Sequence, residues 1–329
     1  MRVLVIKTTS MGDVIHTLPA ITDAVNAIPG VRFDWIVEEG FDEIPAWHPA
    51  VDQVITVALR RWRKTLFSSL RGPEWKLFRQ QVKRVHYDCV IDAQGLLKSA
   101  WLTRYVKAPV FGLDRQSVRE PLASLVYTHK VKVPKAMHAV ERTRHLFAEA
   151  LGYKKPVSKG DYGLDKKHFK YSGPASKNVV FLHGTTKRSK HWPDSYWQQL
   201  AATTTAAGYA VYLPWGNNTE KQRAEKIAHG CEGAEVLPKL NIQGVAAVLS
   251  RADGVVAVDT GLGHLSAALD VPAVSLYGPT SPDLVGAYGQ QQCHLSAKDQ
   301  PPVTGVEPIE MAPLTPALVW RALQSLMDT

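Results

Sequence analysis

The sequence contains few cysteines and no long apolar run. Its 329 residues include only Cys89, Cys231 and Cys293, which are scattered and odd in number. Their spacing suits neither a metal site nor a disulfide framework, so a reducing compartment is expected. No apolar run is long enough to span a bilayer, and the N-terminal run is too short for a secretory signal. We therefore expect a cytoplasmic protein.

Two common cofactor signatures are also missing. No Asp-x-Asp pair is placed to bind a divalent cation, so we predict that the protein needs no metal and no other cofactor. The turns at 10–13 and 259–264 lack the glycine spacing of the dinucleotide fingerprint. That absence disfavours a nicotinamide-dependent oxidoreductase, although such an enzyme would also have two α/β domains.

The charge is unevenly distributed. Apolar residues make up 45% of the chain and charged residues 21%, which is typical of a soluble globular protein. The net charge is +9, and residues 60–144 alone contain 19 basic and 6 acidic side chains. A basic excess confined to one region predicts a polyanionic partner. Nucleic acid, anionic lipid and an acidic saccharide all qualify, but no zinc spacing or recognition-helix pattern supports nucleic acid.

Short apolar runs alternate with helix-compatible segments along the chain. This alternation predicts βαβ units with mostly parallel sheets. A helical pattern also extends from Val14 to Val25. The segment 156–176, rich in Lys, Gly, Ser and Pro, is expected to link two domains at 1–155 and 177–312, and 313–329 to end in a helix. The predicted strands are 2–6, 33–37, 53–57 and 88–92, then 178–182, 210–214, a short one near 236 and 255–258.

Four loops of the second half are expected at one edge of its sheet. In the turn 259–264 an apolar run stops at Asp259, and a helix begins near Gly261. The unpaired N–H groups of such a helix start can bind a phosphate, although many turns of this kind are only connections. The other loops, 183–192, 215–220 and 237–241, add further polar groups. Together they offer Thr185, Thr186, Lys190 and Glu220, a set that suits a nucleotide diphosphate.

The first half has its own polar strand-end loops, 7–13 and 92–99. Asp13 is either a first-turn acid that complements the helix dipole or a carboxylate at the mouth of a cleft. Between the strands, the segment 59–71 places Trp62, Leu66 and Leu70 on one helical face beside several basic residues. Such a segment fits an anionic membrane surface, and it also fits a helix that docks on its own domain.

Three motifs now point to one family. Residues 7–19 (KTTSMGDVIHTLP), 183–193 (HGTTKRSKHWP) and 259–268 (DTGLGHLSAA) together resemble the ADP-heptose:lipopolysaccharide heptosyltransferases over nearly the full length. The resemblance implies the GT-B fold, in which two Rossmann-like domains face each other across a cleft. It places the acceptor in the first domain and the sugar nucleotide in the second, with the C-terminal helix packing back on the first.

The resemblance also implies an activity. Family members transfer L-glycero-D-manno-heptose, with inversion, from ADP-heptose to the inner Kdo of Kdo2-lipid A. By position, Asp13 would be the general base and Lys190 would stabilise the departing diphosphate. Glu220 would hold the ribose. Around the phosphates and the sugar the family would place Thr185, Thr186, Asp259, Thr260, Gly261, Leu262 and His264.

The acceptor of this family gives the basic region a specific anion. Kdo2-lipid A is anionic and lies in a membrane, so we expect peripheral binding to the cytoplasmic face of the inner membrane, with Trp62 touching lipid. Two alternatives remain, a related enzyme that adds a later heptose and a basic nucleic-acid-binding α/β protein. The expected acceptor-binding residues are Lys7, Gly12, Arg60, Arg61, Arg63, Lys64 and Arg119.

Overall fold

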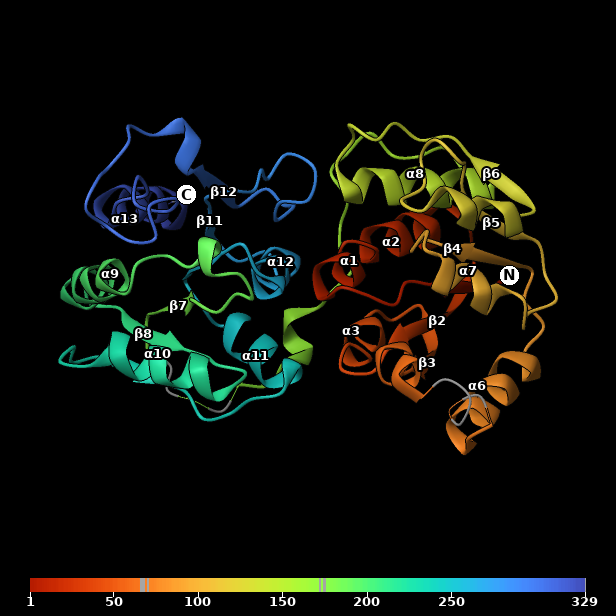
Figure 1. Cartoon of the computed structure of the whole chain (residues 1–329), viewed down its shortest axis with the longest axis horizontal. Coiled ribbons are helices and arrows are strands. Elements are labelled where there is room, and N and C mark those ends of the chain that lie inside the picture. The colour runs from red at the N-terminus through yellow and green to blue at the C-terminus, as the bar shows by residue number, and fades with distance from the viewer. Residues whose placement is uncertain (66–68, 70, 172, 174–175, 329) are drawn as a thin grey trace. The chain divides into compact units, whose positions relative to one another are not determined.

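The computed structural model describes residues 1–65, 69, 71–171, 173 and 176–328. The chain divides into two compact units, Met1–Leu164 and Asp165–Thr329, and Figure 1 shows a sheet flanked by helices in each. Each unit contains one six-stranded sheet whose neighbouring strands pair in parallel. The predicted α/β class with two Rossmann-like domains is therefore confirmed.

The first unit has the strand order β3-β2-β1-β4-β5-β6. After Arg2, its first strand, β1, is apolar and buried because helices cover both sheet faces. Leu4 and Ile6 join the core beneath α6 and α7, whereas Phe33 on the opposite face packs on Phe147 of α8, with ring centroids 6.3 Å apart. The strands are β1 (Arg2–Ile6), β2 (Arg32–Glu38), β3 (Val51–Val57), β4 (Cys89–Asp92), β5 (Val110–Leu113) and β6 (His129–Val131). The helices are α1 (Met11–Ile15), α2 (Leu18–Ala27), α3 (Glu43–Ala46), α4 (Leu59–Trp62), α6 (Pro73–Arg84), α7 (Leu97–Thr103) and α8 (Ala139–Leu151), with 3-10 turns η1 (Arg63–Thr65) and η2 (Pro121–Val126).

The second unit repeats this topology, with the order β9-β8-β7-β10-β11-β12. Its core joins Val179 and Phe181 to the buried Trp192 and Trp197. The strands are β7 (Asn178–Leu182), β8 (Ala210–Leu213), β9 (Ala234–Val236), β10 (Gly254–Val258), β11 (Ala273–Tyr277) and β12 (Gln292–Ser296). The helices are α9 (Asp194–Ala206), α10 (Asn218–Ala228), α11 (Ile242–Leu249), α12 (Gly261–Ala268) and α13 (Pro316–Met327), with 3-10 turns η3 (Lys166–His168), η4 (Arg188–Lys190) and η5 (Ala297–Asp299).

Three sequence predictions need correction. The single helix expected from Val14 to Val25 is two helices, α1 and α2, because Pro19 starts a new helix after Thr17 rather than continuing the first. Part of the expected linker belongs to the first unit, where Ser158 accepts a hydrogen bond from the buried Arg144 at 2.9 Å. The C-terminal helix α13 packs on the second unit's own sheet and on α9. Its buried Val319 and Leu323 complete that core, which corrects the expectation that the first domain would receive them.

Both sheets reverse their strand order beside their first strand. In the first unit β1 lies between β2 and β4, and in the second β7 lies between β8 and β10. Open α/β sheets bind ligands at the carboxyl ends of the strands where this reversal occurs. The loops after β1 and β4, and those after β7 and β10, therefore mark the place to look for a site in each unit.

Candidate functional site

The second unit brings two predicted loops together at the strand reversal. Leu182 of β7 pairs with Ala257 of β10, so the loops that follow these strands begin side by side. The loops after β8 and β9 leave the same edge because all four strands are parallel. The common edge predicted for the four loops is therefore confirmed.

Lys190 and Asp259 form the central contact of this edge. The Lys190 ammonium makes an ion pair with Asp259 Oδ2, and both side chains are only 18% exposed. Two threonines hold the acid: Thr280 Oγ1 donates to Oδ2 at 2.9 Å, and Thr185 Oγ1 donates to the Asp259 carbonyl at 3.2 Å. Sequence reasoning missed Thr280, which lies in a loop without a family motif.

Glu220 lies against the same 183–193 loop. It sits in the first turn of α10, where Asn217 Oδ1 accepts a capping hydrogen bond from the Glu220 N–H at 3.0 Å. Its Oε2 accepts a hydrogen bond from the Gly216 N–H at 2.8 Å. A Cβ atom at Gly184 would lie 2.9 Å from the Glu220 carboxyl carbon. Glycine at 184 is thus what lets the carboxylate approach the loop.

The helix α12 begins at this edge, as expected. Thr260 is its N-cap residue, yet its side chain makes no capping hydrogen bond. The first-turn N–H groups of Gly261 and Leu262 are therefore not capped by that side chain and can bind an anion. His264 lies one turn further and is partly buried, whereas Thr186 of the neighbouring loop is exposed.

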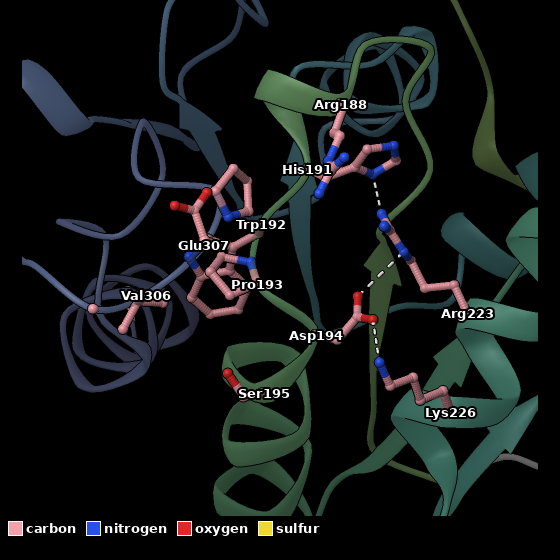
Figure 2. Close-up of a pocket in the computed structure, with 12 residues that line it drawn as sticks. Arg188, His191, Trp192, Pro193, Asp194, Ser195, Arg223, Lys226, Val306 and Glu307 are labelled. Carbon is pink, nitrogen blue, oxygen red and sulfur yellow. Dashed lines mark hydrogen bonds and ion pairs between the residues drawn. The ribbon is translucent and has the colours of Figure 1, made fainter.

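A pocket of about 460 Å³ lies beside the Lys190 turn (Figure 2). In it, the Arg223 guanidinium of α10 contacts His191 Nδ1, and Arg223 Nε lies 3.3 Å from Asp194 Oδ1. Lys226 Nζ is 2.8 Å from the other oxygen of the same acid. Burial, and then the Arg223 charge, lower the pKa of His191. Arg223 therefore ties α10, which bears Glu220, to the residue after Lys190.

In the first unit, Asp13 occupies the first turn of α1. Its Oδ2 accepts hydrogen bonds from the Ser10 N–H at 2.8 Å and from Ser10 Oγ at 2.9 Å. The Lys7 ammonium lies 3.8 Å from Oδ1 and donates to the Ala93 carbonyl at 2.9 Å. Lys7 and Gly12 are both buried. The structure thus confirms Asp13 as a first-turn acid and adds a contact with a buried cation, while its place at the mouth of a cleft stays a prediction.

The loop after β4 supports the Asp13 loop. Gln94 Oε1 accepts hydrogen bonds from the N–H groups of Thr8 at 2.8 Å and Thr9 at 2.9 Å. Lys98 Nζ donates to Thr9 Oγ1 at 3.2 Å, and burial is the main cause that lowers the pKa of Lys98. Lys98 was not among the predicted site residues, although its strand-end loop was noted as polar. Arg60 and Arg63 lie close enough to lower the same pKa further.

The basic segment 59–71 differs from the expected membrane anchor. Trp62 is 5% exposed and packs edge-on against Trp75, with ring centroids 5.4 Å apart. Its indole N–H donates to Glu74 at 2.7 Å, so the prediction that Trp62 touches lipid is wrong. Arg61 pairs with Glu39 and Glu74. Leu66 and Leu70 lie outside the described residues, whereas Arg60, Arg63, Lys64 and Arg119 are exposed.

The described residues contain neither a metal-ligand cluster nor a membrane-spanning helix. Over this part of the chain, no three His, Cys, Asp or Glu side chains gather as metal ligands do. No helix within the described ranges is both long and apolar enough to cross a bilayer. The absence of a metal requirement stays a prediction.

Known proteins resemble this chain along most of its length. Residues 75–309 match the model of glycosyltransferase family 9 (heptosyltransferase). Lipopolysaccharide heptosyltransferase 1 of Pseudomonas aeruginosa is 61% identical over 90% of this chain and 84% of its own. Escherichia coli heptosyltransferase WaaC in a structure with ADP is 50% identical, with a TM-score of 0.92 over 99% of this chain and 100% of its own. In a second structure with ADP-2-deoxy-2-fluoro heptose it is 49% identical, with a TM-score of 0.88 and 99% of each chain covered.

Proposed function

Because this chain belongs to glycosyltransferase family 9, the heptosyltransferase family, we propose that it transfers L-glycero-D-manno-heptose from ADP-heptose to the inner Kdo of Kdo2-lipid A. The chain is a heptosyltransferase of lipopolysaccharide synthesis with a GT-B-like fold. The observation that supports the donor most directly is the contact of Lys190 with Asp259 at the strand reversal of the second sheet.

We assign the donor to the second unit. Lys190, Thr185, Thr186 and the start of α12 at Thr260, Gly261 and Leu262 would bind the diphosphate, because N–H groups and an ammonium complement its charge. Glu220 would accept hydrogen bonds from the ribose hydroxyls. Asp259 and His264 would contact the heptose. The proximity of Thr185 and Lys190 to Asp259 supports a shared role for these loops.

The proposed reaction is a single displacement with inversion. The acceptor hydroxyl gives its proton to the Asp13 carboxylate while its oxygen attacks the anomeric carbon of heptose. The bond from that carbon to the ADP phosphate breaks, and ADP leaves with the electron pair. Lys190 and the α12 start would stabilise the leaving diphosphate, as preorganised donors do where negative charge develops. The two Ser10 hydrogen bonds would orient the base. No metal or other cofactor enters this scheme.

The acceptor belongs to the first unit in this proposal. A Kdo carboxylate and the lipid A phosphates are anions, which a cation near the base would attract. The buried Lys7 ammonium lies 3.8 Å from Asp13 Oδ1. We keep Gly12 and the cations Arg60, Arg61, Arg63, Lys64 and Arg119 as acceptor-binding candidates. Among these, Arg61 would have to exchange one of its two carboxylate partners for the acceptor. Because the acceptor is a lipid, we further propose peripheral binding to the cytoplasmic face of the inner membrane.

One assay tests the function. ADP release from ADP-heptose should occur with Kdo2-lipid A and stop without it, and the product should contain one heptose. An acceptor that already bears the first heptose is the control for a related enzyme that adds a later one. Faster release with that heptosylated acceptor would overturn the proposed step, and release without any acceptor would overturn transfer to Kdo.

A further inference from the structure

Four large apolar side chains are exposed close together in the first unit. Leu97 begins α7, and Leu122, Leu125 and Val126 belong to η2. Their side chains are exposed by 50%, 58%, 68% and 52%. We call these four residues the apolar patch. Apolar groups in contact with water are unfavourable, and a contiguous set of them marks an interaction surface more often than single ones do.

The two elements of the apolar patch are joined by hydrogen bonds. The Leu97 N–H donates to Glu120 Oε2 at 2.6 Å, and the Glu120 N–H donates to the Gly95 carbonyl at 3.2 Å. Residues three apart in a 3-10 helix lie on one side of it, which places Leu122 beside Leu125. The patch is therefore shared between the start of α7 and the adjoining turn.

The patch is presented by a firmly anchored turn. Ala123 lies in the unit's hydrophobic core, together with Tyr127, which directly follows η2. The Tyr127 hydroxyl donates to the buried Asp92 at 2.8 Å. Burial raises the pKa of Asp92, while the Tyr127 hydrogen bond opposes that shift. Because Ala123 holds one side of η2 in the core, Leu122 and Leu125 lie on its exposed side.

Cations border the apolar patch. Lys98 directly follows Leu97, and the exposed Arg119 lies two residues before Pro121 at the start of η2. Arg60 and Arg63 lie close enough to Lys98 to lower its pKa, and the acids that oppose this effect are Glu38 and Glu120. The carboxylate of Glu120 is held by the Leu97 N–H. An apolar patch with a cationic border complements an anionic bilayer, in which acyl chains lie beneath charged headgroups.

The patch also lies near the loop 7–13, which carries Asp13. Lys98, the neighbour of Leu97, donates to Thr9 in the loop that leads to Asp13. In a lipid-linked sugar acceptor, the reacting sugar is covalently bound to a molecule whose acyl chains stay in the membrane. A membrane contact near the loop 7–13 would let the sugar reach the base without extraction of the lipid. This step rests on the proposed function.

We infer that the apolar patch enters an anionic bilayer and holds the first unit on the membrane that contains its acceptor. Partial insertion of leucine and valine side chains supplies apolar burial, and the neighbouring cations attract the headgroups. Binding should therefore depend on both anionic lipid and these side chains.

Co-sedimentation of the full chain with vesicles tests this inference. Vesicles of phosphatidylethanolamine and phosphatidylglycerol should bind the protein, and pure phosphatidylcholine vesicles should bind it much more weakly. The double variant Leu122→Ser/Leu125→Ser should lower the partition coefficient by roughly tenfold or more, because each leucine loses its apolar burial. Leu125→Trp, which keeps a large apolar side chain, should bind at least as well as the original chain.

A matched control uses Leu284→Ser/Val285→Ser, which removes two exposed apolar side chains from the second unit. It should bind vesicles like the original chain. An equal loss in both double variants would overturn the inference, and so would unchanged binding of Leu122→Ser/Leu125→Ser. Size-exclusion chromatography gives another refuting outcome. If the original chain and the control variant are dimers and the patch variant is a monomer, a second copy of the chain covers the patch.

The readout separates this inference from the proposed function. Vesicle binding needs no turnover, so its loss in the patch variant supports the inference even if heptose transfer fails. If transfer occurs, the patch variant should keep its kcat on a deacylated, water-soluble Kdo acceptor and lose rate only on vesicle-borne acceptor. Equal loss on both acceptors would overturn the membrane role.

Discussion

Lys190 and Asp259, 69 positions apart in the sequence, form an ion pair at the carboxyl edge of the second sheet. Lys190 was predicted to bind phosphate and Asp259 to contact the sugar. Their direct contact means that the acid also sets the environment of the cation that we propose binds phosphate. Removal of the lysine alone would leave an uncompensated carboxylate beside the proposed diphosphate.

This pair predicts strongly non-additive kinetics. Lys190→Ala should lower kcat/KM by about 100-fold or more and weaken ADP-heptose binding, since a charge at the leaving group is lost. In the double variant Lys190→Ala/Asp259→Asn the loss should be smaller than the product of the two single effects, because the unpaired acid is also gone. Initial rates and calorimetric donor binding measure this. Lys187→Ala, at an exposed lysine of the same loop, should change little, and additive single effects would contradict the coupling.

Asp13→Asn should separate catalysis from donor binding. The amide oxygen can still accept the Ser10 hydrogen bonds, so the helix start should persist, but the base is lost. Turnover should fall by about 10²- to 10⁴-fold. The affinity for ADP-heptose should stay within about twofold, since we place the donor in the other unit. Thermal melting checks that the variant is folded. Turnover near that of the original chain would remove Asp13 from the mechanism.

Chelation should leave the activity intact. In the proposed scheme Lys190 and the α12 start neutralise the leaving diphosphate, so no divalent cation is needed. ADP release is measured before and after dialysis against EDTA, with magnesium re-addition as the control. A loss that magnesium restores would overturn the prediction of a metal-independent enzyme.

His48 should make the stability of the first unit depend on pH. Its Nδ1 accepts a hydrogen bond from the Ala50 N–H at 3.2 Å, and Nε2 contacts Thr22 Oγ1 at 3.1 Å. Burial is the main cause that lowers the pKa of His48 from 6.5 to about 4; Asp161 opposes this shift and Arg32 adds to it. The unfolded chain therefore binds this proton first as the pH falls.

The resulting stability is fully present above about pH 6.5 and is lost as the pH falls toward 4. The loss should be on the order of 2–3 kcal/mol by the linkage of pKa to stability. Urea unfolding at pH 7.5, 5.5 and 4.5 measures it. In His48→Gln the slope should decrease, whereas His168→Gln, at an exposed histidine, should keep it. An unchanged slope in His48→Gln would contradict the assignment.

The sheets could be predicted from the sequence because their central strands are buried on both faces. The runs at 2–6, 178–182 and 255–258 lie within β1, β7 and β10. Strands β5, β6, β11 and β12 were not predicted. Of these, β5 and β6 are short, with four and three residues, and are partly exposed, whereas β11 has five buried residues. Parallel strand ends share an edge, so the grouping of the loops 183–192, 215–220, 237–241 and 259–264 also followed from the sequence.

Side-chain partners could not be predicted in this way. The pattern of Trp62 fits both a membrane anchor and a docked helix, and the choice depended on Trp75 and Glu74, whose positions relative to Trp62 are fixed only by the fold. In the same way, no spacing rule connects Thr280 or Lys190 to Asp259. These contacts join separate loops, whereas periodicity reports only which face a residue occupies within one element.

Arg223 allows a test of what positions Glu220 relative to Lys190. It follows Glu220 by three residues, so both lie on one side of α10, and it contacts both His191 and Asp194. We predict that Arg223→Met raises the KM for ADP-heptose about tenfold with a smaller effect on kcat. The reason is that the distance between Glu220 and Lys190 is no longer fixed.

The matched control is Lys226→Met, which removes the other cation paired with Asp194 but no contact to His191. Its kinetics should resemble those of the original chain. Arg223→Met should also raise the pKa of His191, because the Arg223 charge is one of the causes that lower it, and an NMR titration of the imidazole measures this shift. A general loss of packing would alter both variants alike and would not produce the titration shift. Equal KM values in the two variants would therefore show that the Arg223–His191 contact does not position the donor.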